Sequence, residues 1–438
     1  MPSVALQTLG CKVAQYETEA IAEKFAECGF LVVPFNSKAD VYVINTCTVT
    51  AEADSKSRRM IRRAGKRNPD AVIAVVGCYS QVATDEVLAL GASVVLGTDN
   101  KLSVVDRVIE RLSDKMLPAF SECCDLSEAS FERMTVKNAP RTRAYVKIED
   151  GCESRCSYCA IRIARGCVRS KPRADALAEI KKLSENGVRE VVLTGIETGA
   201  YGKDFDEKYT LGDLIAELDS LGYPERIRLG SLAPELVGNE FAEKIKNTRS
   251  LAPHFHISMQ SGSDKVLALM KRKYNSRMAY DNIMRLREMF PDAEFTTDMM
   301  VGFPGECEED FLLSLDFISR VGFLDVHVFQ YSKRRGTVAA ELPGQIPEVV
   351  KHERSRRMIE HKNRVRDERL LRLISNAGEL SVIAETKLPT GEYSAHADNF
   401  AEVRFLSKSD FDLKGKLVKV RPVSHKDGII YAEEIVCL

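Results

Sequence analysis

The sequence contains no long apolar run, almost no net charge and no dense cysteine framework. No stretch reaches the roughly 18 apolar residues that a membrane-spanning helix needs, so no membrane contact is expected. The 63 basic and 64 acidic residues nearly cancel, so any contact with a nucleic acid would depend on local basic patches. Met1 leads into a strand-like run without a basic segment, which argues against a secretory signal peptide. The twelve cysteines in 438 residues are therefore expected to be reduced thiols in the cytoplasm, with metal binding as their use rather than disulfides.

Residues 3–112 alternate short apolar runs with helical patterns. The expected helices cover about residues 17–28, 53–67 and 81–90, and the expected strands are VALQTLG, FLVVPF, VYVINT, AVIAVVG and SVVLG. Nearly continuous Val and Ile runs between helices are typical of a parallel sheet with both faces covered. The sequence therefore predicts an α/β chain whose first domain, residues 1–112, is a doubly wound parallel sheet. Residues 113–143 are polar and contain prolines, which predicts a linker.

A second alternating series begins at residue 144. Its six expected strands lie in AYVKIED, EVVLTGI, RIRLGSL, HFHISMQ, EFTTDMMVGF and FLDVHVFQYS. Six strand–helix units predict an open, partial (β/α)6 barrel over residues 144–373, which ends in a strongly charged helix at about 347–375. Residues 374–438 contain turn signals in PTG, KG and KDG, so they are expected to form a small β-barrel.

Cys152, Cys156 and Cys159 form a CxxxCxxC motif in the stretch GCESRCSYCAI. Thiolates are the usual ligands of iron–sulfur clusters, and no fourth cysteine follows at ligand spacing. The motif therefore predicts a [4Fe-4S] cluster with one open iron, which could chelate a small molecule and pass it an electron. A zinc site with a distant fourth ligand stays the alternative, although paired CxxC motifs are the commoner zinc signature.

Cys11, Cys47 and Cys78 share a position rather than a spacing, because each directly follows an expected strand of the first domain. The carboxyl ends of parallel strands open on one edge of a sheet, where such folds bind ligands. We therefore expect these three thiols to converge and to hold a second [4Fe-4S] cluster. The alternative is that they are small apolar fillers of the core. The remaining cysteines fit no such pattern and are expected to be structural: Cys28, Cys123, Cys124, Cys167, Cys307 and Cys437.

Two basic runs are candidates for contact with RNA phosphates. Residues 56–67, KSRRMIRRAGKR, contain seven Lys/Arg and no acid, and residues 351–372 contain nine Lys/Arg against four acids. Solvated helix faces are the alternative for both runs. The terminal module is not basic, with eight Lys/Arg against ten acids from residue 374 onward. Recognition of RNA there would have to use bases or shape, through residues such as Tyr393, His396, Asn399 and Phe400, unless these only form the barrel core and turns.

Several stretches together resemble the methylthiotransferase branch of the radical S-adenosylmethionine (SAM) enzymes, and the match covers nearly the whole chain. They are TLGCKVAQYETEA, VINTCTVTAEADSKSRRMIRR, VVGCYSQ, DGCESRCSYCAIRIARG, LTGIETGAYG, SMQSGSDKVLALMKRKY, MMVGFPGECEEDF and FQYSKRRGT. The resemblance implies an auxiliary cluster in the first domain, a SAM cluster in the barrel and a terminal TRAM domain that binds tRNA. The first two stretches most resemble the enzymes that act on N6-threonylcarbamoyladenosine at position 37 of the tRNA anticodon loop.

The same resemblance points to residues that contact SAM. They are Tyr158, Gly195, Ser231, Gln260 and Arg272, for which ordinary packing, a turn or satisfaction of backbone groups is the alternative. The sequence departs from the family at Arg162 and Ser258, where the family usually has proline. Both changes restore a backbone donor and a freer φ, so they affect the local backbone rather than a ligand.

The activity implied is the transfer of a methylthio group. In the family, SAM bound at the open iron is cleaved to a 5'-deoxyadenosyl radical, which abstracts hydrogen from C2 of the adenosine before the sulfur is transferred. A small electron donor such as a flavodoxin or ferredoxin is also implied. Alternative targets are isopentenyladenosine in tRNA and an aspartate of a ribosomal protein. A different class of function, an iron–sulfur electron carrier with an RNA-binding tail, would need neither an open iron nor a barrel.

Overall fold

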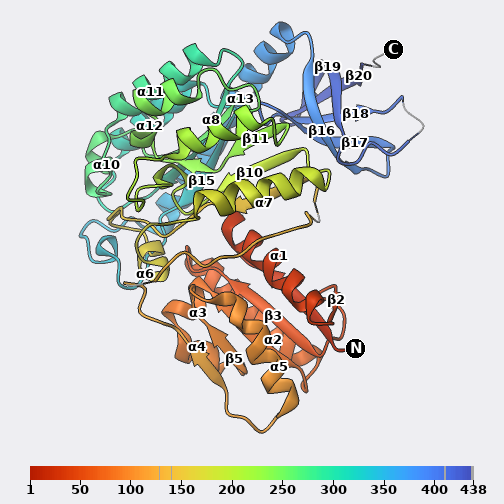
Figure 1. The fold of residues 1–438 in the computed structure, drawn as a ribbon. Coiled ribbons are helices and arrows are strands. Elements are labelled where there is room, and N and C mark those ends of the chain that lie inside the picture. Colours follow the sequence, from red (N-terminus) through yellow and green to blue (C-terminus); the bar gives the residue numbers. More distant parts are fainter. Residues whose placement is uncertain (128, 140, 409–410, 436–438) are drawn as a thin grey trace.

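The computed structural model describes residues 1–127, 129–139, 141–408 and 411–435. Figure 1 shows a first sheet (red to orange), a barrel-like unit (yellow to cyan) and a terminal β-barrel (blue). The predicted α/β class with parallel sheets and a small terminal barrel is confirmed. Cys437 lies outside the described residues. Within these residues, no helix combines the length and the apolar character that crossing a membrane requires.

The first sheet has six strands, all parallel, in the order β2-β1-β3-β4-β5-β6. The strands are β1 (Ser3–Thr8), β2 (Leu31–Val33), β3 (Val41–Thr46), β4 (Val72–Gly77), β5 (Val94–Leu96) and β6 (Phe120–Glu122). The helices are α1 (Lys12–Glu27), α2 (Ala51–Arg67), α3 (Cys78–Val82), α4 (Thr84–Ala89) and α5 (Val104–Ser113), with a 3-10 turn η1 (Lys101–Ser103). Separate apolar clusters cover the two faces of the sheet, which is why β3 and β4 are buried along their whole length.

The segment predicted as a linker, 113–143, contributes to the first domain. Its strand β6 pairs in parallel with β5, so the sheet extends beyond the boundary predicted at 112. Met134 and Val136 from the same segment are buried beside Tyr16 of α1. The three-residue strand FSE is too short and too polar to produce a strand pattern in the sequence.

The middle unit is a partial barrel of six parallel strand positions. They are β7 (Arg143–Lys147), β10 (Glu190–Thr194), β11 and β12 (Arg226–Leu229 and Ser231–Leu232), β13 (His254–Gln260), β14 (Glu294–Val301) and β15 (Asp325–Gln330). The helices are α6 (Ile161–Arg165), α7 (Arg173–Glu185), α8 (Leu211–Leu221), α9 (Asn239–Ile245), α10 (Asp264–Leu269), α11 (Ser276–Met289) and α12 (Glu308–Val321). Short elements complete it: β8 (Glu149–Asp150), β9 (Arg169–Ser170), η2 (Thr198–Ala200), η3 (Pro234–Leu236) and η4 (Val338–Ala340).

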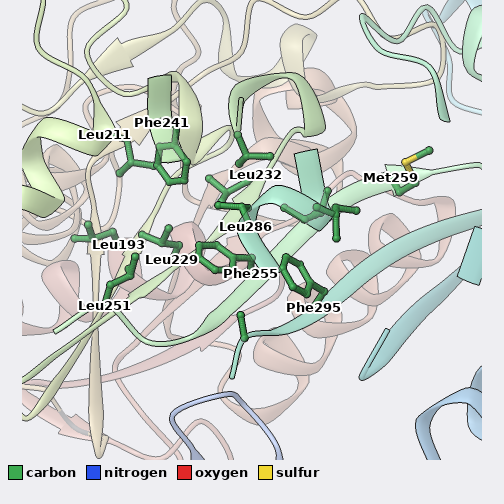
Figure 2. Packing of buried hydrophobic residues seen from close by; sticks show 14 of the residues in the cluster. Leu193, Leu211, Leu229, Leu232, Phe241, Leu251, Phe255, Met259, Leu286 and Phe295 are labelled. Carbon is green, nitrogen blue, oxygen red and sulfur yellow. The ribbon is translucent and has the colours of Figure 1, made fainter. Parts of the chain in front are cut away.

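The two faces of the barrel strands differ in polarity. Successive side chains of a strand point to opposite faces. Phe255, Ile257 and Met259 of β13 belong to the main apolar core, which Figure 2 shows around Phe255 and Phe295. The alternate residues of β13 are polar, and His254 and His256 both hydrogen-bond the Thr296 hydroxyl on β14. The strands therefore enclose a polar interior rather than an apolar core.

The chain ends in a long helix and a closed five-stranded barrel. The elements are α13 (Glu348–Asn376), β16 (Leu380–Lys387), β17 (Glu392–Ala397), β18 (Glu402–Leu406), β19 (Leu417–Lys426) and β20 (Ile429–Glu434). Phe400 stacks on His254 with ring centroids 4.5 Å apart, and Arg228 donates to the carbonyl oxygens of Ala397 and Asp398. The terminal barrel thus covers the amino ends of the middle strands.

This docking favours the alternative given for four residues of the terminal barrel, namely that they form its core and contacts rather than an RNA-reading surface. Tyr393 is 1% exposed and donates to Asp412, and Asn399 is 5% exposed. His396 bonds Glu385, and Phe400 faces His254. The sequence could not separate these roles because aromatic and polar residues near turns suit an RNA surface and a buried contact equally well.

We expect Phe255→Ala to lower the free energy of unfolding by about 3–5 kcal/mol, because a large ring leaves a cavity in the main core. Phe255 is 0% exposed and stacks on Phe295. Chemical denaturation with circular dichroism measures the change. Phe411→Ala is the matched control because Phe411 is 66% exposed. Equal losses in the two variants would contradict the assigned core.

Candidate active site

The loop between β8 and α6 carries the CxxxCxxC motif and aims a hydrogen-bond donor at each sulfur. The backbone N–H groups of Ser154 and Ile161 donate to Sγ of Cys152 and Cys159, each at 3.4 Å. The Arg272 guanidinium donates to Sγ of Cys156 at 3.1 Å. Hydrogen bonds to sulfur favour the thiolate and adjust the potential of a bound cluster. The loop therefore fits three corners of an iron–sulfur cluster.

These three thiols lie close enough to affect one another electrostatically. The pKa of Cys159 is raised to about 11, mainly by burial and in part by the negative charges of Cys156 and Cys152. Burial also raises the pKa of Cys152. A group of thiolates that repel one another is stabilised by a bound cation, whose binding releases the protons.

Gly151 sets the shape of this loop. It adopts φ +82°, and a Cβ there would lie 1.8 Å from the carbonyl oxygen of Cys167. The Cys152 N–H donates to the Gly166 carbonyl, which ties the motif to the end of α6. A residue without a side chain is therefore required just before the first cysteine.

Cys11, Cys47 and Cys78 come together at the carboxyl edge of the first sheet. Cys11 precedes α1, Cys47 follows β3, and Cys78 begins α3 directly after β4. Burial raises the pKa of Cys47 to about 11, and the charges of Cys78 and Cys11 contribute. The three sulfurs thus lie close together at this edge, as their strand-end positions predict, while their binding of a cluster stays a prediction.

A buried network of charges joins the two cysteine groups, and Arg165 of α6 is at its centre. Its Nε donates to Sγ of Cys78 at 3.2 Å, and its Nη1 donates to Glu17 at 2.9 Å and to Asp150 at 3.0 Å. Glu17 lies on α1 and Asp150 immediately precedes Gly151. Two buried lysines complete the network by bonding Glu17: Lys101 and Lys147.

Sequence reasoning missed this network. The available signal was Glu17, which lies on the apolar side of α1 four residues before Ile21. A carboxylate on a buried helix face requires a cationic partner, but the sequence does not show which one. Arg165 supplies it from a helix that is distant in the chain.

Of the residues predicted to contact SAM, Tyr158 lies within the CxxxCxxC loop and Arg272 bonds its Cys156. Tyr158 packs edge-on against Phe303 with ring centroids 6.2 Å apart. Arg272 also donates to the Ser258 carbonyl, so Ser258 takes part through its backbone. Ser231 lies on β12, and Gln260 ends β13 at φ +69°.

Gly195 lies against a carboxylate that the sequence reading missed. A Cβ on Gly195 would lie 2.5 Å from Glu149 Oε2, which accepts the Glu197 N–H. Glu149 Oε1 is buried and has no hydrogen-bond partner among the described residues. Burial raises the pKa of Glu149 well above its usual range and that of Glu197 to about 7. Both carboxyls act on Cys152 electrostatically, so a cationic ligand would stabilise them beside the cluster loop.

Comparison with known proteins agrees with this arrangement. The model of the Radical SAM superfamily matches residues 146–318, and that of the uncharacterized protein family UPF0004 matches residues 3–97. The threonylcarbamoyladenosine tRNA methylthiotransferase MtaB of Bacillus subtilis is 38% identical over 99% of this chain and 96% of its own. This chain belongs to the radical SAM methylthiotransferase family. As a radical SAM methylthiotransferase it is an enzyme that uses SAM and a [4Fe-4S] cluster.

Other methylthiotransferases match over similar lengths. MtaB of Thermotoga maritima is 36% identical over 98% of this chain and 96% of its own. The tRNA-2-methylthio-N(6)-dimethylallyladenosine synthase of Thermoanaerobacter pseudethanolicus is 32% identical over 98% of this chain and 92% of its own. The solved radical SAM methyltransferase TsrM of Kitasatospora setae has a TM-score of 0.57 and 16% identity, with 77% of each chain covered. This last likeness concerns the fold alone.

Gly151→Ala should lower the iron content of the radical SAM methylthiotransferase by about half or more, because the loop must move to relieve the contact with Cys167. Iron analysis and the visible absorption spectrum after anaerobic reconstitution measure the loss. Gly187→Ala is the control, because Gly187 also has positive φ but no atom within 4 Å of the added Cβ. Full iron occupancy in Gly151→Ala would refute the requirement for glycine.

Arg165→Met should destabilise the protein by about 3–5 kcal/mol, because it leaves Glu17 and Asp150 buried with a cationic partner removed. Chemical denaturation measures this cost. Arg162→Met on the same helix is the matched control, since no ion pair of Arg162 is found in the part of the chain that the structure describes.

The same network has a defined pH dependence. Arg165 holds the pKa of Glu17 and of Asp150 low against the effect of burial. The ionised carboxylates of Glu17 and Asp150 therefore stabilise the folded state above about pH 4, which is the pKa of such carboxyls in an unfolded chain. This contribution is lost as the pH falls further. The difference between the two variants should therefore shrink below about pH 4; a constant difference would contradict the ionised network.

Proposed function

We propose that this enzyme transfers a methylthio group to C2 of N6-threonylcarbamoyladenosine at position 37 of tRNA. The observation that carries the proposal is the pair of three-cysteine groups on facing domains, which share the Arg165 network. The similarity to MtaB over almost the whole chain supports the choice of substrate. The dimethylallyladenosine synthases match less closely, which makes their substrate the second candidate.

We assign the SAM cluster to Cys152, Cys156 and Cys159, and a second [4Fe-4S] cluster to Cys11, Cys47 and Cys78. Convergence of each group and mutual repulsion of its thiols support both assignments. The N–H···S bonds of Arg272 to Cys156 and of Arg165 to Cys78 give each group one cationic donor. These donors would offset the negative charge of a thiolate-bound cluster.

SAM would bind where Glu149, whose Oε1 has no partner among the described residues, and Glu197 meet the open corner of the cluster. Glu149 and Glu197 would pair with its amino and sulfonium charges, while Gly195 leaves the space that Glu149 occupies. Arg272 would bind the carboxylate of SAM, and Tyr158 would pack against its adenine. The strand-end residues Ser231 and Gln260 would contact its ribose. When bound, the cluster supplies the one-electron cleavage of SAM that starts the radical chemistry.

The chain's own task is positioning. Arg165, Glu17 and Asp150 hold α1 of the first domain against the cluster loop of the barrel. Their bonds would keep the reacting carbon of the adenosine between the two cysteine groups, because a small displacement of reacting atoms costs much of the rate. The terminal barrel closes the opposite end of the polar interior and limits entry of water.

The tRNA would contact α2 rather than α13. Arg59, Arg62 and Arg63 of α2 are exposed, and no ion pair is found for them within the described ranges. In α13, Lys351 and Arg354 are buried, and Arg369 bonds Glu294. The basic run of α2 is thus available for phosphates, whereas much of the run in α13 supports packing. A cytoplasmic location and a flavodoxin- or ferredoxin-like electron donor fit this role.

Mass spectrometry of tRNA nucleosides tests the proposal. A strain without its own methylthiotransferases should gain 2-methylthio-N6-threonylcarbamoyladenosine when it expresses this chain, whereas 2-methylthio-isopentenyladenosine would indicate the second candidate. Cys47→Ala should lower iron by about half and abolish methylthiolation while SAM cleavage continues; Cys156→Ala should abolish SAM cleavage as well. Cys28→Ala is the control at an exposed cysteine. Identical losses in the Cys47 and Cys156 variants would sink the division of roles.

A further inference from the structure

Lys12 places an unpaired positive charge beside the proposed auxiliary cluster. It directly follows Cys11, begins α1 and is half-buried. Its ammonium makes no hydrogen bond or ion pair with any residue that the structure describes. Nearby buried cations behave differently, since Lys101 and Lys147 both bond Glu17. A partly desolvated ammonium without a partner loses hydration without compensation, so the site favours an anionic ligand.

The surroundings locate this ammonium in the interior of the barrel. The charges that act on it most strongly belong to Arg228, Arg143, Asp298 and Glu190. These residues lie on four different strands, β11, β7, β14 and β10. Charges from four strands act together on one group only near the polar interior that these strands share. Lys12 therefore extends from the first domain into the polar interior.

The charged groups around Lys12 already have partners of their own. Glu190 is already bonded by Arg228 at 2.7 Å, and Arg143 lies 3.6 Å from it. Asp298 pairs with His256 at 3.3 Å. The charges around Lys12 are thus engaged with one another, and within the described residues the Lys12 ammonium is left without a bonded anion.

A metal ion is the rival ligand for this region. Ligand atoms of His256, Asp298 and His327 lie within 4.8 Å of one another, which is compatible with a metal site. However, Lys12 acts on Asp298 with its positive charge. A divalent cation at the same place would be repelled by Lys12, Arg143 and Arg228. The three side chains are better suited to hydrogen-bonding a polar organic ligand.

We propose that Lys12 binds the carboxylate of the threonylcarbamoyl group and thereby selects the substrate. This inference rests on the proposed function. The carboxylate carbon of that group lies about seven covalent bonds from C2, and both extend from the same edge of the adenine. Lys12 and Cys11 are consecutive, with Cα atoms about 3.8 Å apart, so the cation and the sulfur that serves C2 come from one short segment. Asp298 and His327 lie beside each other in this region and are placed to bond the hydroxyl and urea groups of the same side chain.

The pairing explains how an uncharged side chain would be rejected. A dimethylallyl group offers no anion, so it would leave Lys12 desolvated and unpaired. Sites that hydrogen-bond a substrate group discriminate strongly against analogues that lack it, because the buried partner stays unsatisfied. Lys12 is thus a specificity residue that contacts the substrate.

Equilibrium binding of anticodon stem-loop RNAs to the reconstituted full-length enzyme tests this role. Three RNAs differ only at position 37: N6-threonylcarbamoyladenosine, its uncharged methyl ester, and adenosine. Wild-type enzyme should bind the carboxylate RNA about tenfold to a hundredfold more tightly than the ester, as expected for a charge-assisted hydrogen bond. Lys12→Gln should lose this preference and bind the ester RNA within about twofold of wild type.

Lys24→Gln is the matched control, because Lys24 lies on the same helix but is exposed. It should keep the preference for the carboxylate. Equal binding of the carboxylate and ester RNAs by wild-type enzyme would overturn the inference without using any variant. So would an unchanged preference in Lys12→Gln. Failure of the wild-type enzyme to methylthiolate the carboxylate RNA would instead refute the proposed function.

Discussion

The arrangement of the two halves depends on one buried guanidinium. Arg165 belongs to the barrel unit, yet it bonds Glu17 and Cys78 of the first domain as well as its neighbour Asp150. A buried ion pair yields little net stability compared with apolar packing, because desolvation offsets most of its attraction. It does specify geometry, since charged groups out of water tolerate few alternative partners. The network therefore mainly fixes how the two cysteine groups face each other, although removing one partner is costly because it leaves a buried charge unpaired.

The second constraint is the polar interior of the barrel. Ordinary closed barrels fill this space with branched apolar side chains. Here the inward positions of the strands carry groups such as Arg228, His256 and Asp298, while the outward positions build the apolar core under the helices. The partial barrel has six strand positions, and α1 packs against its strand β7. Folding energy thus comes from the outer layer, and the inner layer is left free for chemistry.

Much of this architecture could be predicted from periodicity and position. The short apolar runs predicted the strands of the first sheet and of the barrel. The strand-end positions of Cys11, Cys47 and Cys78 predicted that these residues converge. The strand β6 was missed because three residues, of which only Phe120 is apolar, are too few to carry a pattern. Arg165 was missed because pairing across domains leaves no spacing in the sequence.

The roles of the terminal barrel also lay beyond the sequence. Residues such as Tyr393 and Phe400 have the composition of an RNA-binding face, but tertiary packing turns them toward the protein. Composition describes what a surface could bind, whereas burial depends on neighbours that only the fold brings close. The same limit applied to Lys12, whose proposed role depends on side chains from four strands that are far away in the chain.

The contact of the terminal barrel with the amino ends of the middle strands has an evolutionary consequence. Arg228 donates to carbonyls of residues 397 and 398, and Arg226 bonds Ser381. Removing this barrel would expose both arginines and the His254 ring, and another β-module would have to reproduce the same acceptors. The terminal unit is therefore poorly suited to exchange by domain shuffling, and it should be inherited together with the barrel whose floor it forms.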